Sequence, residues 1–458
     1  MKKTVSAIAV VALLLASCEE KPEVGPGGGK PSNPSTPDTP SAWVSKAKNV
    51  SSVAEFNSVG TLAPGDTVIW ADGRYSGVNI TFSGTGSADL PIVLRAATPG
   101  QVVFKGVSSL TLKGTHLEAY GFVFNELNTS STKSFIYFDS SSSKCRVHDC
   151  MIDGTGSTEN PDNKSHWVSM PGLENELYNC TFLDKRDMGL MVCGLPGDVP
   201  IRHKIYRNRF YRPFGFLTEG NSGVNGQEVI RIGTSDVSLK DACCEVYENY
   251  FHDVIGENGE IISNKSCKNV YYSNYFEYCY GALTLRHGNG CTVRGNYFLG
   301  GRSKYEGGVR VIGEDHTVEG NYFRDLTGSG IRSALCIMQG TENPELYEYY
   351  QVKNLLVKDN KFLNCAYSIY INYAGTGCVM PVTGVTMTGN CISASSSSAY
   401  TVYFVRPEEG GVTWTDNRIY GGRQSGTDLP TVSGAPVFPL FDTPARAIKA
   451  NAGVCWER

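Results

Sequence analysis

A short pattern of apolar and polar positions recurs along most of the chain. Each copy has an apolar residue, two polar residues, usually Asn, one variable residue and then Phe or Ile, as in Val246–Phe251 and Val293–Phe298. The copies follow one another at intervals of 22 to 41 residues. The Asn position is occupied in turn by Tyr120, Cys150, Cys180, Asn208, Asn249, Asn274, Asn296, Asn321, Asn360, Asn390 and Asn417.

This period fits one coil of a right-handed parallel β-helix with two or three strands per coil. Propeller blades are longer, and leucine-rich repeats need Leu-x-Leu ladders that the chain lacks. We expect the Asn to adopt the left-handed conformation at a bend and to form a hydrogen-bonded ladder, while the following Phe or Ile points inward. The predicted fold is all-β, a single-domain right-handed parallel β-helix.

Two departures from the regular repeat are informative. Near the start, Ser52 can cap a short helix that carries Val53, Phe56 and Val59 on one face, before a strand at 67–70. Such a helix would cover the open edge of the stack. The two intervals of about 40 residues, before Asn249 and Asn360, predict inserted loops, which in solenoids often build the functional site.

The first residues indicate export. Residues 1–18 have a basic start, a short apolar run and Leu15–Cys18, which resembles a bacterial lipobox and implies a lipid anchor at Cys18. Residues 19–41 are rich in Pro, Gly, Ser and Thr and predict a disordered tether, followed by the β-helix domain at 42–458. An exported lipoprotein of the outer membrane, on its periplasmic face or the cell surface, is therefore expected.

Composition narrows the range of functions. The 41 basic and 45 acidic residues nearly balance, which argues against a nucleic-acid partner. Fourteen cysteines follow Cys18, most of them in strand-like runs and without metal-site spacing. Small buried core residues are the better interpretation of these cysteines than a disulfide framework. No further apolar stretch is long enough to span a bilayer, and a monomer is expected.

Three cations fall at similar distances before the repeated Asn. Lys265 lies nine residues before Asn274, and Arg286 and Arg310 precede their own Asn by ten and eleven. On stacked coils, about 4.8 Å apart, they should form a basic row on one outer face, with a bulge or variable turn absorbing the drift. Acidic residues flank the row: Glu228, Glu260, Glu314 and Asp315. A solvated charged surface is one explanation, and a groove for a polyanionic chain is the other.

Several motifs resemble one enzyme family. They are SNKS at Lys265, RHGN twenty-one residues later, GGVRVIGEDH, NGQEVIRIGTS and the segment AEFNSVGTLAPGDTVIWADGRY. Together these motifs are similar to the alginate lyase and chondroitinase B family, polysaccharide lyase family six, over roughly residues 45–420. The resemblance implies a right-handed parallel β-helix that cleaves acidic polysaccharides by β-elimination.

The resemblance also implies roles for individual residues. Lys265 matches the family's base, Arg286 its acid, and His287 and Arg310 its substrate-binding positions. Like-charge repulsion from Arg286 would favour a neutral Lys265 amine. His316 is a further substrate-binding candidate, with a structural histidine as the alternative. Of three tyrosines after the second insertion, Tyr367, Tyr370 and Tyr373, some could stack on sugars, with Tyr373 the candidate for the site and core packing the alternative for at least one.

One position departs from the family pattern. Many members hold Ca²⁺ with an Asn and a Glu-x-Glu pair, which here correspond to Asn225 and to Asn258-Gly259-Glu260. An amide in place of one carboxylate should weaken binding of a hard cation. We therefore expect no required cofactor and weak or no calcium dependence, with Asn225, Asn258 and Glu260 as the doubtful metal ligands.

The predicted activity is lysis of alginate, with mannuronate-rich chains favoured and an acidic polysaccharide as the partner. A chondroitin or dermatan sulfate lyase is the nearest alternative, although sulfated chains would call for more basic residues. A pectinase-like hydrolase would need paired carboxylates at the groove centre, and the acids here flank a basic row. A non-catalytic glycan-binding β-helix is the alternative outside the enzymes.

Overall fold

The computed structural model describes residues 47–127, 134–215 and 226–457. The predicted signal peptide and tether, with Cys18, lie outside the described residues, so the lipid anchor and the outer-membrane location stay predictions. No helix in the described part is long and apolar enough to cross a membrane.

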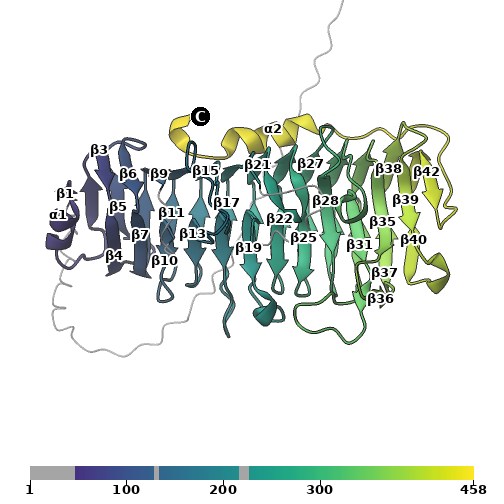
Figure 1. Cartoon of the computed structure of the whole chain (residues 1–458), viewed down its shortest axis with the longest axis horizontal. Helices are drawn as coiled ribbons and strands as arrows, with labels where there is room; N and C mark the ends of the chain where they lie inside the picture. The colour runs from purple at the N-terminus through teal and green to yellow at the C-terminus, as the bar shows by residue number, and fades with distance from the viewer. Residues whose placement is uncertain (1–46, 128–133, 216–225, 458) are drawn as a thin grey trace, which may run out of the picture. The chain divides into compact units, whose positions relative to one another are not determined.

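Three long parallel sheets wind into a parallel β-helix, which confirms the predicted fold class (Figure 1). Each coil adds one strand to each sheet. Sheet 1 has 14 strands: β1 (Ala47–Val50), β2 (Thr67–Trp70), β5 (Ile92–Ala96), β8 (Leu117–Tyr120), β11 (Arg146–His148), β14 (Glu176–Tyr178), β17 (Lys204–Tyr206), β20 (Glu245–Tyr247), β23 (Val270–Tyr272), β26 (Thr292–Arg294), β29 (Thr317–Glu319), β33 (Leu356–Lys358), β37 (Val385–Thr388) and β40 (Val412–Thr415).

The other two sheets have 13 strands each. Sheet 2, which carries the cations, contains β4 (Asn79–Thr85), β7 (Ser109–Thr115), β10 (Ile136–Phe138), β13 (Val168–Met170), β16 (Val192–Gly194), β19 (Ile230–Gly233), β22 (Ile255–Lys265), β25 (Tyr280–His287), β28 (Glu306–Val311), β31 (Leu335–Met338), β35 (Tyr367–Tyr373), β39 (Tyr400–Phe404) and β42 (Arg423–Ser425). Sheet 3 contains β3 (Gly73–Ser76), β6 (Val102–Gly106), β9 (Phe122–Leu127), β12 (Met151–Asp153), β15 (Thr181–Leu183), β18 (Arg209–Tyr211), β21 (Tyr250–His252), β24 (Tyr275–Glu277), β27 (Tyr297–Leu299), β30 (Tyr322–Arg324), β34 (Lys361–Leu363), β38 (Cys391–Ala394) and β41 (Arg418–Gly421). A short antiparallel pair, β32 (Gly340–Thr341) and β36 (Cys378–Met380), lies outside them.

The repeated Asn sits at the bend between sheets 1 and 3. From Asn208 to Asn417, each side-chain amide and each backbone N–H donates to the carboxamide oxygen of the next Asn at 2.9–3.1 Å. The expected ladder is confirmed, but the expected left-handed Asn is wrong. The residue before it has the positive φ, for example Glu248 at 53° and Asp359 at 54°, because this frees the Asn itself to bond along the stack.

Phenylalanines fill the interior behind this bend. Successive rings stack with centroids 4.6–5.0 Å apart along Phe182, Phe210, Phe251, Phe276, Phe298, Phe323 and Phe362. All fourteen described cysteines are free thiols and most are buried, in agreement with the expected packing role. The coils are thus held by ring stacking and amide ladders rather than by disulfides.

A short helix covers the N-terminal end, as predicted. In α1 (Val53–Ser58), the Ser52 side chain accepts a hydrogen bond from the Glu55 backbone N–H at 3.2 Å. Phe56 is the buried residue of the helix, and its ring lies 6.1 Å from that of Trp70 in β2. The helix therefore packs its apolar side onto the first coils.

Residues after β42 form a C-terminal strap, 438–457, that runs back across the outer face of sheet 3 (Figure 1). Its helix α2 (Asp442–Asn451) buries Ala445 and Ile448 against tyrosines of β21, β24 and β30. Beyond the helix, the Val454 N–H donates to Thr181 Oγ1 and the Cys455 N–H to Asp149 Oδ1, each at 3.0 Å. The strap therefore connects coils that are far apart in sequence.

Candidate active site

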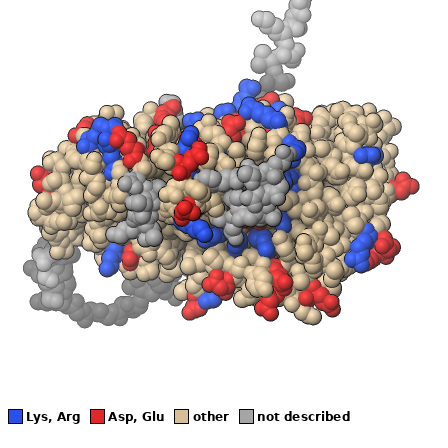
Figure 2. Space-filling view, viewed as in Figure 1, with Lys and Arg blue, Asp and Glu red and all other residues tan. Residues whose placement is uncertain are grey.

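A pocket of about 580 Å³ opens on the outer face of sheet 2, where β22, β25 and β28 lie side by side. Figure 2, in the same view as Figure 1, shows Lys and Arg over the middle of the molecule together with Asp and Glu. The pocket is lined by Ser235, Glu257, Glu260, Lys265, Arg286, His287, Arg310, Ile331, Met338, Tyr347, Tyr349, Tyr373, Ala374, Gly375 and Thr376. It thus brings together five of the six residues predicted to be catalytic or substrate-binding.

The cations do not occupy equivalent positions on successive strands. A bulge after Asn264 pairs Lys265 with His287, so Arg286 is the extra residue of β25. Arg310 pairs with Thr284, two residues before Arg286. The predicted basic row is therefore wrong in register, although the expected bulge is present. Side-chain length brings the three cations to one pocket.

The second insertion holds Arg286 in place. Its guanidinium donates to the backbone carbonyls of Tyr347 at 3.0 Å and Glu348 at 3.2 Å, and lies 4.1 Å from the ring centroid of Tyr349. These three residues belong to the long segment between β32 and β33. Burial lowers the pKa of Arg286 from its ordinary value, yet the group remains a cation because that value is far above neutral. The inserted loop predicted to build the site does so by fixing one side chain.

His287 is a neutral hydrogen-bonding residue. Burial, followed by the charges of Arg286, Lys265 and Arg310, lowers its pKa to about 2. An arginine can only donate, so His287 Nδ1, 3.3 Å from Arg286 Nη1, accepts. Nε2 then carries the proton and faces Ser235 Oγ at 3.2 Å. The ring therefore positions groups in the pocket without adding charge.

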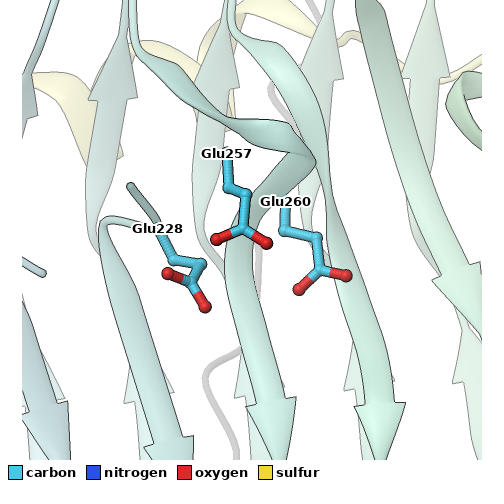
Figure 3. A group of neighbouring side chains, drawn as sticks. All are labelled: Glu228, Glu257 and Glu260. Atoms are coloured by element: carbon cyan, nitrogen blue, oxygen red, sulfur yellow. The ribbon is translucent and has the colours of Figure 1, made fainter. Parts of the chain in front are cut away.

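Three glutamates, Glu228, Glu257 and Glu260, lie close together (Figure 3). One carboxylate oxygen from each of Glu228, Glu257 and Glu260 lies within 4.8 Å of the other two. Lys265 Nζ is 3.6 Å from Glu228, and Arg310 Nη1 is 3.4 Å from Glu260. Burial, then the charges of Glu228 and Glu260, raises the pKa of Glu257 to about 8. The negative charge of the three carboxylates is thus offset by the Lys265 and Arg310 side chains and by a proton on Glu257.

This cluster differs from the predicted metal ligands. Asn225 and the side chain of Asn258 lie outside the described residues, whereas Glu260 is in the cluster. Glu257 was missed, although it immediately precedes Asn258 in the sequence. Both carboxylate oxygens of Glu228 are buried without a hydrogen-bond partner among the described residues. Such buried, unsatisfied oxygens fit a hard divalent cation.

His316 does not reach the pocket, which corrects the prediction that it binds substrate. Its side chain is buried, its Nδ1 accepts from the Cys291 N–H at 3.0 Å, and its Nε2 donates to the Ile312 carbonyl at 3.0 Å. Burial lowers its pKa to about 4, so it stays neutral. The structural alternative therefore holds for His316, because both ring nitrogens are used by the backbone.

Comparison with known proteins agrees with this architecture. The Chondroitinase B family model matches residues 48–378. The chain is 28% identical to a variant of the PL6 family alginate lyase AlyGC (TM-score 0.77; 90% of this chain and 59% of that chain). It is 27% identical to a mannuronic acid specific polysaccharide family 6 lyase enzyme from human gut microbiota (TM-score 0.74; 90% of this chain and 96% of that chain).

A third structure is similar in fold. The PL6 family polysaccharide lyase Pedsa3628 from Pseudopedobacter saltans is 24% identical, with a TM-score of 0.69 over 89% of this chain and 99% of that chain. No curated protein sequence matches. The chain spans 59% of the length of the AlyGC chain that it matches. With a family match over well more than half of its residues, the chain belongs to the chondroitinase B family, the polysaccharide lyases of family 6.

Proposed function

We propose that the protein cleaves alginate, with mannuronate-rich chains as its substrate, by β-elimination in the pocket on sheet 2. The observation that carries this proposal is the meeting of Lys265, Arg286, Arg310 and neutral His287 in one open pocket. A polyuronate brings one carboxylate per sugar, and clustered cations in a partly dry pocket attract such a chain.

The chemistry assigns separate tasks to these residues. Lys265 Nζ, which acts only in its uncharged form and not as the ammonium that pairs with Glu228, removes the proton from the carbon beside the uronate carboxylate. Arg286 and Arg310 stabilise the charge that builds up on that carboxylate. The bond to the glycosidic oxygen then breaks, and Arg286, directly or through a water it orients, supplies the proton to the leaving oxygen. The new non-reducing end carries an unsaturated uronate, and Tyr373 lies where a sugar ring can pack against it.

Charge in the pocket favours an unsulfated substrate. Of its three cations, Lys265 and Arg310 are partly offset by Glu228 and Glu260. A sulfated chain carries additional charge on each repeat and would need further cations to offset the cost of removing it from water. The family 6 lyase from human gut microbiota, which matches over 96% of its length, is described as mannuronic acid specific, and this supports the same choice.

Mixing the full-length protein with polymannuronate is expected to raise ultraviolet absorbance, because elimination creates a conjugated double bond. The rise should be fastest on polymannuronate, slower on polyguluronate and absent on chondroitin and dermatan sulfate. A faster rise on a sulfated chain would establish the alternative substrate. Binding of polymannuronate without any absorbance change would instead identify a non-catalytic glycan-binding protein.

We also propose that Glu228, Glu257 and Glu260 bind a divalent cation such as Ca²⁺. When bound, the ion would neutralise the carboxylates and attract the uronate carboxylate. Calcium at concentrations well above its Kd is expected to raise the Tm by at least about 2 °C relative to protein in EDTA. Glu257→Gln should abolish this shift, whereas Glu245→Gln, on sheet 1, should preserve it. Equal shifts in both variants would refute the site.

The requirement for calcium in catalysis is a separate question. The sequence-based prediction of weak or no dependence stays a prediction, since Arg286 and Arg310 already supply positive charge to the pocket. Calcium dependence is measured as the initial rate on polymannuronate before and after EDTA treatment, in the same samples that are used for the Tm. A rate that disappears with EDTA and returns with Ca²⁺ would contradict it.

A further inference from the structure

Five tyrosines cover the outer face of the last coils of sheet 2. Tyr367, Tyr370 and Tyr373 belong to β35, and Tyr400 and Tyr403 belong to β39. We call them the tyrosine platform. All five are half-buried, and none of their hydroxyls has a hydrogen-bond partner or is fully enclosed in the described structure. By contrast, Tyr206 and Tyr272 on sheet 1 use their hydroxyls to bind Glu176 and Glu245.

The platform is continuous with the catalytic pocket. Tyr373 lines the pocket, and its ring centroid lies 5.3 Å from that of Tyr370. Tyr370 in turn lies 4.8 Å from Tyr403 and 6.1 Å from Tyr367. Tyr367 and Tyr400 are 4.8 Å apart. Aromatic side chains therefore extend from the wall of the pocket along the sheet toward its C-terminal end.

Ring orientation distinguishes the platform from ordinary outer-face stacking. On sheet 1, a ladder of rings has neighbouring planes within 21° of parallel, so each ring covers the faces of the next; it comprises Tyr120, His148, Tyr178, Tyr206, Tyr247 and Tyr272. In the platform, Tyr367 stacks on Tyr370 and Tyr400 at 20° and 28°. The other pairs are steeper: Tyr370 and Tyr373 meet at 78°, and Tyr403 meets Tyr370 at 54° and Tyr400 at 89°. Edge-to-face packing leaves ring faces that are not covered by the partner ring.

Charge on the platform suits an acidic chain. The Arg423 guanidinium lies 3.9 Å from the ring centroid of Tyr400, is exposed, and has no carboxylate partner among the described residues. Toward the C-terminal end, Figure 2 shows mostly uncharged surface with a few separate charged side chains of both signs. A largely aromatic surface with one unpaired cation is typical of a site that packs against sugar rings and pairs with a single carboxylate.

We propose that the tyrosine platform is a second binding region for the same acidic polysaccharide, outside the catalytic pocket. Tyr400 lies between the Tyr367 ring and the Arg423 guanidinium, so sugar rings bound there pack against Tyr403, and a uronate carboxylate pairs with the Arg423 that Tyr400 positions. The platform holds long chains on the enzyme while an adjoining segment occupies the pocket. This inference rests on the proposed function for its ligand, but binding at the platform does not require catalysis.

The test uses the full-length protein and a double variant, Tyr400→Leu with Tyr403→Leu, which keeps apolar volume but removes the aromatic faces. The KM for long polymannuronate is expected to rise at least about fivefold with little change in kcat. The ratio of kcat/KM on long chains to kcat/KM on a trisaccharide should fall by the same factor. The matched control, Tyr206→Leu with Tyr247→Leu on sheet 1, should leave this ratio unchanged.

A second arm separates this proposal from the proposed function. In a Lys265→Met background, affinity electrophoresis in polymannuronate measures binding alone, and the platform variant should weaken it at least about fivefold. Arg423→Gln, a change at an exposed side chain, should weaken binding of polymannuronate about twofold or more.

An unchanged Kd for polymannuronate in both variants overturns the proposed platform, even if the enzyme is active. A change in oligomeric state would identify a contact between copies and also overturn it. An inactive wild type that still binds through the platform overturns only the proposed function.

Discussion

Replacing Lys265 with methionine is expected to lower kcat on polymannuronate by about 10²- to 10⁴-fold, the range typical of losing a positioned base. Methionine keeps the length and packing of the side chain but has no lone pair basic enough to take the proton. The measurement is the initial rate of ultraviolet absorbance increase. The matched control is Lys268→Met. Lys268 lies three residues after Lys265, is exposed and pairs with Asp241, so this variant should retain full activity.

The same variant also leaves Glu228 without its cation. Glu228 is fully buried and Lys265 is mostly buried, and removing one partner of such a pair is strongly destabilising. We therefore expect a lower Tm for Lys265→Met and recovery of that Tm when Glu228→Gln is added. Activity should remain absent in the double variant. If activity returned together with stability, Lys265 would be a structural residue and the base would have to be sought elsewhere.

Replacing Arg286 with lysine is expected to lower kcat by about 10²- to 10³-fold, although the charge is kept. Lysine cannot donate at once to the carbonyls of Tyr347 and Glu348 and stack on Tyr349, so its ammonium would not be held at the reacting oxygen. Arg286→Ala should lower kcat at least as much. The rate on saturating polymannuronate measures both variants.

A control for this substitution lies on sheet 1. Arg294 lies 4.5 Å from the ring centroid of Tyr272, so Arg294→Lys alters a similar stacked arginine far from the pocket. It should leave kcat unchanged. An Arg286→Lys enzyme with more than half of the wild-type rate would show that positive charge alone is sufficient, and that the contacts from the inserted loop have no catalytic importance.

The fold could be predicted because its determinants are local and repeated. Each coil contains its own Asn and its own inward Phe, so one short pattern specifies the architecture many times. The pattern did not specify which residue takes the positive φ. Glu248, Asp359 and their equivalents adopt it because Asn must donate along the stack.

The site was predictable in part. Its residues on β22, β25 and β28 follow from the repeat, and the drift in their spacing predicts a bulge. The position of that bulge, after Asn264, depends on the side chains packed around it and is not fixed by the spacing. Tyr347 and Tyr349 lie in an insertion whose path no repeat constrains. Glu257 does not align with the family's Glu-x-Glu pair, so the motif gives no signal for it, yet the fold brings its carboxylate to Glu228 and Glu260 from the position next to Asn258.

The C-terminal strap affects how the β-helix comes apart. In a solenoid, each coil contacts only its neighbours, so coils can be lost one at a time from an open end. Here the segment that follows the last strand bonds to Asp149 and Thr181, which belong to coils in the first half of the stack. The strap therefore couples the C-terminal end of the stack to those coils, and we expect unfolding to be more cooperative than nearest-neighbour coupling alone would allow.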